Sequence, residues 1–89
     1  MRAVHKYPLT LTDTQVIEFP LGAQILSVQE QHGTLTMWVL NDLQPIGMVP
    51  YRIRIHGTGH TITEYPGEYV GTVQQHDGNL VWHVFAQPI

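Results

Sequence analysis

Hydrophobic and polar residues alternate along much of the chain, and the alternation is clearest in residues 48–56, MVPYRIRIH. A period of two places successive side chains on opposite faces of a β-strand. This segment is therefore predicted to be a strand with one buried face and one polar face. The buried face would carry Tyr51, Ile53 and Ile55, and the polar face would carry Arg52, Arg54 and His56.

Two further stretches each contain a pair of strand-like runs around a short turn sequence. Residues 23–42, AQILSVQEQHGTLTMWVLND, turn at His32-Gly33, and residues 68–87, EYVGTVQQHDGNLVWHVFAQ, turn at Asp77-Gly78. Glycine supplies the permissive backbone that tight turns need, and Asp-Gly is a strong hairpin signal. Each stretch is predicted to be a β-hairpin.

Residues 2–9 and 15–19 are weaker strand candidates, and Tyr65–Glu68, YPGE, has Pro and Gly where a type II turn prefers them. Pro or Gly interrupts most windows, so no helix is predicted. We therefore predict an all-β fold with a single domain over residues 1–89. Six or seven short strands would form a small antiparallel sandwich or a partly open barrel.

The last predicted strand is apolar on both faces, because Leu80, Trp82 and Val84 alternate with Val81 and Phe85. Residues 35–40, LTMWVL, show the same property. Strands of this kind are buried on both faces. Two explanations remain open: the second sheet and short loops cover them, or a partner subunit closes one layer.

Charge is sparse in this chain. Charged residues make up 12% of it, against about 25% on average, and Asp77 is the only charged residue from Tyr69 to Ile89. One interpretation is that Gln, Thr and His side chains solvate this surface. We favour the other, in which a second copy covers part of it, and predict a homo-oligomer with Trp82 and Phe85 at the interface.

The formal net charge of −3, with four Lys and Arg residues, argues against binding to extended nucleic acid, which needs many phosphate contacts. There is no cysteine, which excludes disulfides and thiolate chemistry. No apolar run approaches a membrane span, and the N-terminus lacks the apolar segment of a signal peptide. We expect a soluble, cytoplasmic protein that does not engage a membrane.

Residues 56–60, HGTGH, contain two histidines at a spacing that zinc sites use. The Gly-Thr-Gly linker and the lack of a carboxylate within two positions weaken that interpretation, and no metal or other cofactor is predicted. Ser27, the only serine, lies mid-strand without a nucleophile elbow. A non-enzymatic protein is therefore expected, and a metal-dependent hydrolase using His56 and His60 is the least favoured class.

Anion binding fits the same stretch better. Alternate residues of a strand lie roughly 7 Å apart on one face, so Arg52 and Arg54 would be neighbours. Like charges in this arrangement need a negative partner, which would be Glu64, Glu68 or a ligand phosphate, for which the guanidinium fork is well shaped. The alternative is a solvated arginine face that ends in a glycine-rich bend.

Glycines let backbone N–H groups converge on an anion, which extends the predicted site into the turn. Thr58 would add a hydroxyl and His60 a ring, while the nearby aromatic Tyr51 would stack on a base. The complete set of predicted ligand-binding residues is Tyr51, Arg52, Arg54, His56, Gly57, Thr58, Gly59 and His60.

Segments along most of the chain resemble a family of short uncharacterised phage and prophage proteins. They include KYPL (6–9), TDTQ (12–15), PLGAQILSVQ (20–29), Trp38, IRIHGTGH (53–60), YVGTVQ (69–74) and GNLVWHVF (78–85). The resemblance implies an accessory or counter-defence protein in the cytoplasm of an infected bacterium, and it transfers no catalytic residue. By analogy with unrelated families, some such factors are oligomeric sponges for cyclic nucleotide or ADP-ribose-type immune signals.

Together these observations predict a non-enzymatic homo-oligomer that sequesters a small phosphorylated ligand. The alternative is a protein–protein interaction module, either an inhibitor of a host protein or a small virion or assembly component. In that case the charge-poor surface around Trp82 and Phe85 would be the working face.

Overall fold

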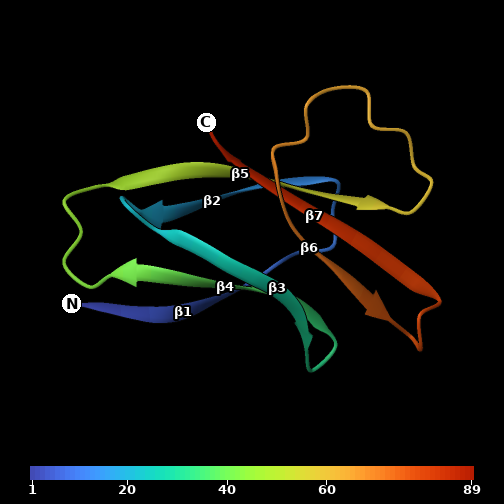
Figure 1. Ribbon diagram of the computed structural model, residues 1–89, viewed down its shortest axis with the longest axis horizontal. Coiled ribbons are helices and arrows are strands. Elements are labelled where there is room, and N and C mark those ends of the chain that lie inside the picture. Colours follow the sequence, from blue (N-terminus) through green and yellow to red (C-terminus); the bar gives the residue numbers. More distant parts are fainter.

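A computed structural model describes all of residues 1–89 and contains seven strands and no helix. The fold is therefore without any helix that could cross a membrane. The all-β prediction is confirmed, and its sandwich form holds, because the strands form two separate sheets that do not close into a barrel (Figure 1). The strands are β1 (Arg2–Pro8), β2 (Thr14–Pro20), β3 (Gln24–Gln31), β4 (Thr34–Asp42), β5 (Met48–Gly57), β6 (Glu68–Gln75) and β7 (Leu80–Pro88).

One sheet has the strand order β1-β4-β3 and the other has the order β2-β5-β7-β6, and every pairing is antiparallel. Both predicted hairpins are present, as β3–β4 and β6–β7. His32 and Gly33 have φ angles of 51° and 84° between β3 and β4. Positive φ at both central residues is what a tight type I′ hairpin turn requires.

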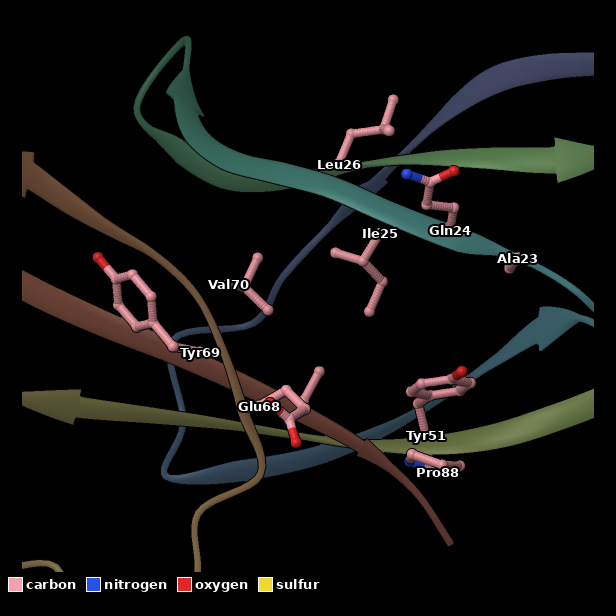
Figure 2. Close-up of a pocket in the computed structure, with 10 residues that line it drawn as sticks. Ala23, Gln24, Ile25, Leu26, Tyr51, Glu68, Tyr69, Val70 and Pro88 are labelled. Atoms are coloured by element: carbon pink, nitrogen blue, oxygen red, sulfur yellow. The ribbon is translucent and has the colours of Figure 1, made fainter.

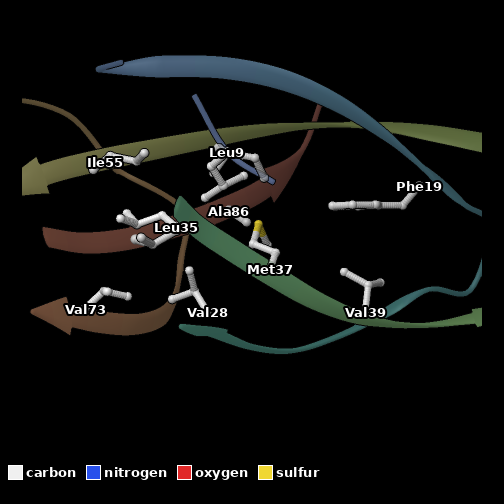
Figure 3. Close-up of a cluster of buried hydrophobic side chains, with 11 residues drawn as sticks. Leu9, Phe19, Val28, Leu35, Met37, Val39, Ile55, Val73 and Ala86 are labelled. Carbon is white, nitrogen blue, oxygen red and sulfur yellow. The ribbon is translucent and has the colours of Figure 1, made fainter. Parts of the chain in front are cut away.

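The core lies between the sheets and consists of apolar residues of strands β2 to β7, together with Leu9 just after β1 (Figure 3). Ile53 and Ile55 of β5 are buried in it, as the period-two pattern predicted. Burial of this apolar area is the main force that holds the two sheets together. The core residues are Leu9, Phe19, Val28, Leu35, Met37, Val39, Ile53, Ile55, Val73, Val84 and Ala86.

The connection from β5 to β6 is the longest loop of the fold, residues 58–67. Because β7 lies between β5 and β6, this loop has to pass from one side of β7 to the other. Figure 1 shows it extending away from the sandwich before it returns to the start of β6. Gly67, at the end of the loop, has a φ of 108°, the sign that the third position of a type II turn requires.

Candidate functional site

The outer face of the four-stranded sheet carries the polar row of β5. Arg52, Arg54 and His56 alternate with the inward-facing isoleucines and share this face. Antiparallel pairing sets Gln87, Phe85 and His83 of β7 opposite them in that order. Aromatic and polar side chains of β7 therefore lie beside this row on the same face of the sheet.

The Gly57–His60 segment is a tight turn that closes β5. The His60 backbone N–H donates to the Gly57 carbonyl at 3.1 Å, and Gly59 has a φ of 83°. The histidine ring then folds back over Gly57, since a Cβ built on that glycine would lie 2.7 Å from His60 Cε1. Gly57 is thus needed for this ring position, and Gly59 for the bend itself.

His83 links the turn to the two strands beside it. Its Nε2 lies 2.7 Å from Thr58 Oγ1, and its Nδ1 lies 3.0 Å from Thr72 Oγ1 on β6. Thr72 Oγ1 is in turn 2.6 Å from the Tyr69 hydroxyl. Hydroxyl groups both donate and accept, so this chain accommodates either tautomer of the imidazole.

Arg54 has internal partners. Its Nη1 donates to the carbonyls of Tyr65 and Pro66 at 3.3 and 3.4 Å, and its Nη2 lies 3.5 Å from Glu64 Oε1. All three distances are long for hydrogen bonds, and the Glu64 side chain is 75% exposed whereas that of Arg54 is 15% exposed. A guanidinium has five donors, so Arg54 can still bind a further acceptor.

His56 packs against Phe85 of β7, with ring centroids 5.8 Å apart and planes at 68°. Its Nε2 is buried and has no hydrogen-bond partner. Buried polar atoms are normally paired, and Asn41 Oδ1 and Gln87 Oε1 are buried without a partner in the same way.

A depression of about 350 Å³ lies beside this row, at the edge between β2, β5 and the loop. Three basic side chains line it, namely Arg54, His56 and His60. Two carboxylates, Asp13 and Glu64, line it as well. The other lining residues are Thr14, Ile55 and Thr61.

Five residues of the predicted site do not line the depression, namely Tyr51, Arg52, Gly57, Thr58 and Gly59. Tyr51 faces the inner side of β5, away from Arg52 and Arg54, and packs on Phe19 with a centroid distance of 5.1 Å. The structure therefore does not bring this aromatic ring to the arginine row. Arg52 shares the face of Arg54 but is not a lining residue of the depression.

Trp82 and Phe85 also face opposite sides of β7. The Trp82 indole N–H donates to Gln75 Oε1 at 2.9 Å and its ring packs against the core. Phe85 lies on the outer face, between His56 and Tyr69. The two side chains do not share one surface.

No group of three or more His, Asp or Glu side chains is placed to hold a metal ion. The pKa of the Tyr65 phenol is raised above 10.0 chiefly by its hydrogen bond to Glu68. Burial and the charge of Glu68 add to this shift.

Sequence reasoning missed the participation of His83 and Thr72. His83 sits 23 positions beyond His60 in the chain, and only the register of β5 against β7 sets it opposite His56. The available signal was weak: a lone polar residue within the apolar run LVWHVF. A polar residue in such a run has to find partners when the strand is covered.

The family model described as "Domain of unknown function (DUF7352)" matches residues 1–89. No curated protein and no solved structure matches the chain.

Proposed function

The chain belongs to the DUF7352 family, a domain of unknown function, and we propose that it is a non-enzymatic binder of a small phosphorylated ligand. The ligand class is a cyclic nucleotide or an ADP-ribose-type signal, which the protein sequesters. The context is that of a phage accessory protein acting in the cytoplasm of an infected bacterium.

One observation carries the proposal: Arg54, His56 and His60 line a single depression next to the glycine turn. An Arg fork matches the geometry of a phosphate, and histidine nitrogens add donors to the other phosphate oxygens.

The carboxylates in the depression set the condition for binding. Glu64 Oε1 lies 3.5 Å from Arg54 Nη2, so an entering phosphate that uses this donor has to displace it. The exposed position of Glu64 makes this displacement easy, because exposed ion pairs contribute only about 0–1 kcal/mol. Arg54 itself stays in place, since the Tyr65 and Pro66 carbonyls still hold it.

Self-association is part of the proposal. Several apolar side chains are exposed outside the core, among them Val4, Val16 and Leu26, each between 45% and 53%. Val4 is paired with Leu40 on the outer face of the three-stranded sheet, and this apolar pair together with the low charge of the chain is what supports a homo-oligomer. A preformed pocket at a subunit interface would bind the ligand tightly although the chain has few cationic residues.

A protein–protein interaction module is the second candidate. The outer face of the β1-β4-β3 sheet favours it, because Trp38 and Leu40 remain only half-buried there and Val4 pairs with Leu40 in register. An apolar outer face with an aromatic anchor is typical of interaction surfaces.

A thermal-denaturation panel tests the binder proposal. The purified protein is mixed with cyclic dinucleotides, cyclic trinucleotides and cyclic ADP-ribose isomers. A ligand at 100 times its Kd stabilises the fold by about 2.7 kcal/mol, which raises the Tm by roughly ten degrees or more in a domain of this size. An unchanged Tm with every nucleotide at high excess would refute the proposal. Recovery of the bound ligand intact after heating checks that it is not turned over.

Two variants locate the site if a ligand is found. Arg54→Gln should abolish the Tm increase, while Arg2→Gln, which removes an equal charge from β1, should leave it unchanged. Equal loss in both variants would mean that net charge, and not this depression, governs binding. Light scattering at micromolar concentration tests the proposed self-association, and a monomeric mass would contradict it.

A further inference from the structure

A second and larger cavity, of about 420 Å³, opens on another part of the molecule (Figure 2). Its walls come from the first residues of β3 and β6, together with Tyr51 of β5 and Pro88 of β7. It thus lies between the two sheets, where the edge strands β3 and β6 separate. Small-molecule sites typically have volumes of 300–1,000 Å³ and mainly apolar walls.

Local irregularities of the two edge strands create this space. Gly71 packs directly on Val28, since a Cβ on the glycine would lie 2.9 Å from Val28 Cγ1. This contact brings β6 and β3 together at that level. The register of β3 shifts between Ile25 and Ser27, and that of β6 between Tyr69 and Gly71. A bulge bends its strand, so both edges diverge just before the contact.

Glu68 is the only charged side chain that lines the cavity. Gly67 fixes its position, because this glycine packs on the Ala86 backbone so closely that a Cβ would lie 2.8 Å from it. One carboxylate oxygen, Oε1, accepts a hydrogen bond from the Tyr65 hydroxyl at 2.7 Å. The second oxygen has no hydrogen-bond partner within the protein and is available to a ligand.

The remaining walls are apolar or aromatic. Ile25 and Val70 supply aliphatic surface and Tyr51 supplies a ring, whereas the side chains of Leu26 and Tyr69 point away from this space (Figure 2). Faces of aromatic rings attract cations, and a carboxylate does so more strongly. A phosphate would meet only Glu68 here, and like charges repel.

We propose that this cavity binds a small organic cation, an amine with an aromatic or aliphatic body. The apolar walls take the body, and Glu68 with the Tyr51 ring takes the ammonium group. The site is separate from the phosphate depression, and the two share no lining residue. The proposal therefore stands whether or not the protein binds a nucleotide.

The test uses three molecules with the same indole body and different charge: tryptamine, tryptophol and indole-3-acetate. Each is titrated into the ¹⁵N-labelled protein at low salt, and amide shifts are followed. We expect saturable shifts at residues 23–26 and 68–70. Tryptamine should bind about tenfold more tightly than indole-3-acetate, with tryptophol between them. No saturable shift at these residues with any of the three would overturn the proposal.

Glu68→Gln and Glu64→Gln form a matched pair, because each removes one carboxylate from the same region of the chain. Glu68→Gln should keep tryptophol binding and lose the preference for tryptamine. Glu64→Gln should keep that preference. Amide spectra of both variants establish that they are folded. A preference for tryptamine that survives in Glu68→Gln, or disappears in Glu64→Gln, would refute the role of Glu68.

Discussion

Thr58 Oγ1 lies 2.7 Å from His83 Nε2, and this contact joins the turn after β5 to β7, an interior strand of the four-stranded sheet. The same imidazole reaches Thr72 on β6 through Nδ1. The His83 side chain thereby connects β7 to the turn after β5 and to β6. The turn next to the proposed phosphate site is held by this connection.

The first prediction concerns that contact. Thr58→Val removes the hydroxyl and keeps the shape of the side chain, so the free energy of unfolding should fall by about 1 kcal/mol, the usual contribution of one hydrogen bond. Thr58→Ser keeps the hydroxyl and should change the stability little. Urea denaturation followed by tryptophan fluorescence measures both variants. Equal stability of the valine and serine variants would show that the contact contributes nothing.

The hairpins could be predicted because their signals are local. His32-Gly33 and Asp77-Gly78 each lie between the strands that they connect, and the structure places both turns there. The second turn is more elaborate than expected, since His76, Asp77 and Gly78 all have positive φ. The alternation in β5 likewise identified its buried face correctly, because it depends only on neighbouring residues.

The surroundings of Arg54 and the 420 Å³ cavity could not be predicted in this way. Glu64 was one of two acids considered as a partner for the arginines, and only the path of the loop decides between it and Glu68. The cavity depends on two bulges, and a single inserted residue leaves little trace in a hydrophobic pattern. Contacts between distant segments depend on the register of the paired strands, which local sequence patterns do not determine.

The second prediction compares two glycines. In Gly67→Ala the new Cβ would meet the backbone of Ala86 at 2.8 Å, and the φ of 108° is unfavourable for alanine. Because backbone atoms cannot move aside, the variant should lose about 2–4 kcal/mol. In Gly57→Ala the Cβ meets only the exposed ring of His60, which can rotate away, so the loss should stay below about 1 kcal/mol. Urea denaturation of the two variants would contradict this if their losses were equal.

The third prediction follows from the raised pKa of Tyr65. Its hydrogen bond to Glu68 favours the protonated phenol in the folded state. The stabilisation is therefore present below the ordinary pKa of 10.0 and is lost as the pH rises through the higher folded value. The difference in phenolate absorbance between the wild type and Tyr65→Phe isolates this group. In Glu68→Gln its pKa should return toward 10.0, and a pKa unchanged by this substitution would rule out Glu68 as the cause.

The last prediction addresses the competition between Glu64 and a ligand for Arg54. If a phosphate has to displace Glu64, removing that carboxylate should strengthen binding, because Arg54 keeps its carbonyl contacts and loses a competitor. Glu64→Gln should therefore bind inorganic pyrophosphate about three- to tenfold more tightly, which corresponds to about 0.7–1.4 kcal/mol.

Glu18→Gln is the matched control, because Glu18 lies on β2 in the same sheet and its loss changes the net charge equally, yet it does not line the depression. Titrations followed by the ring signals of His56 and His60 give the affinities. A gain that is the same in both variants would come from net charge alone. A gain confined to Glu64→Gln would place the anion at Arg54, whereas a loss there would contradict the competition and mean that Glu64 holds Arg54 in the position that binds the anion.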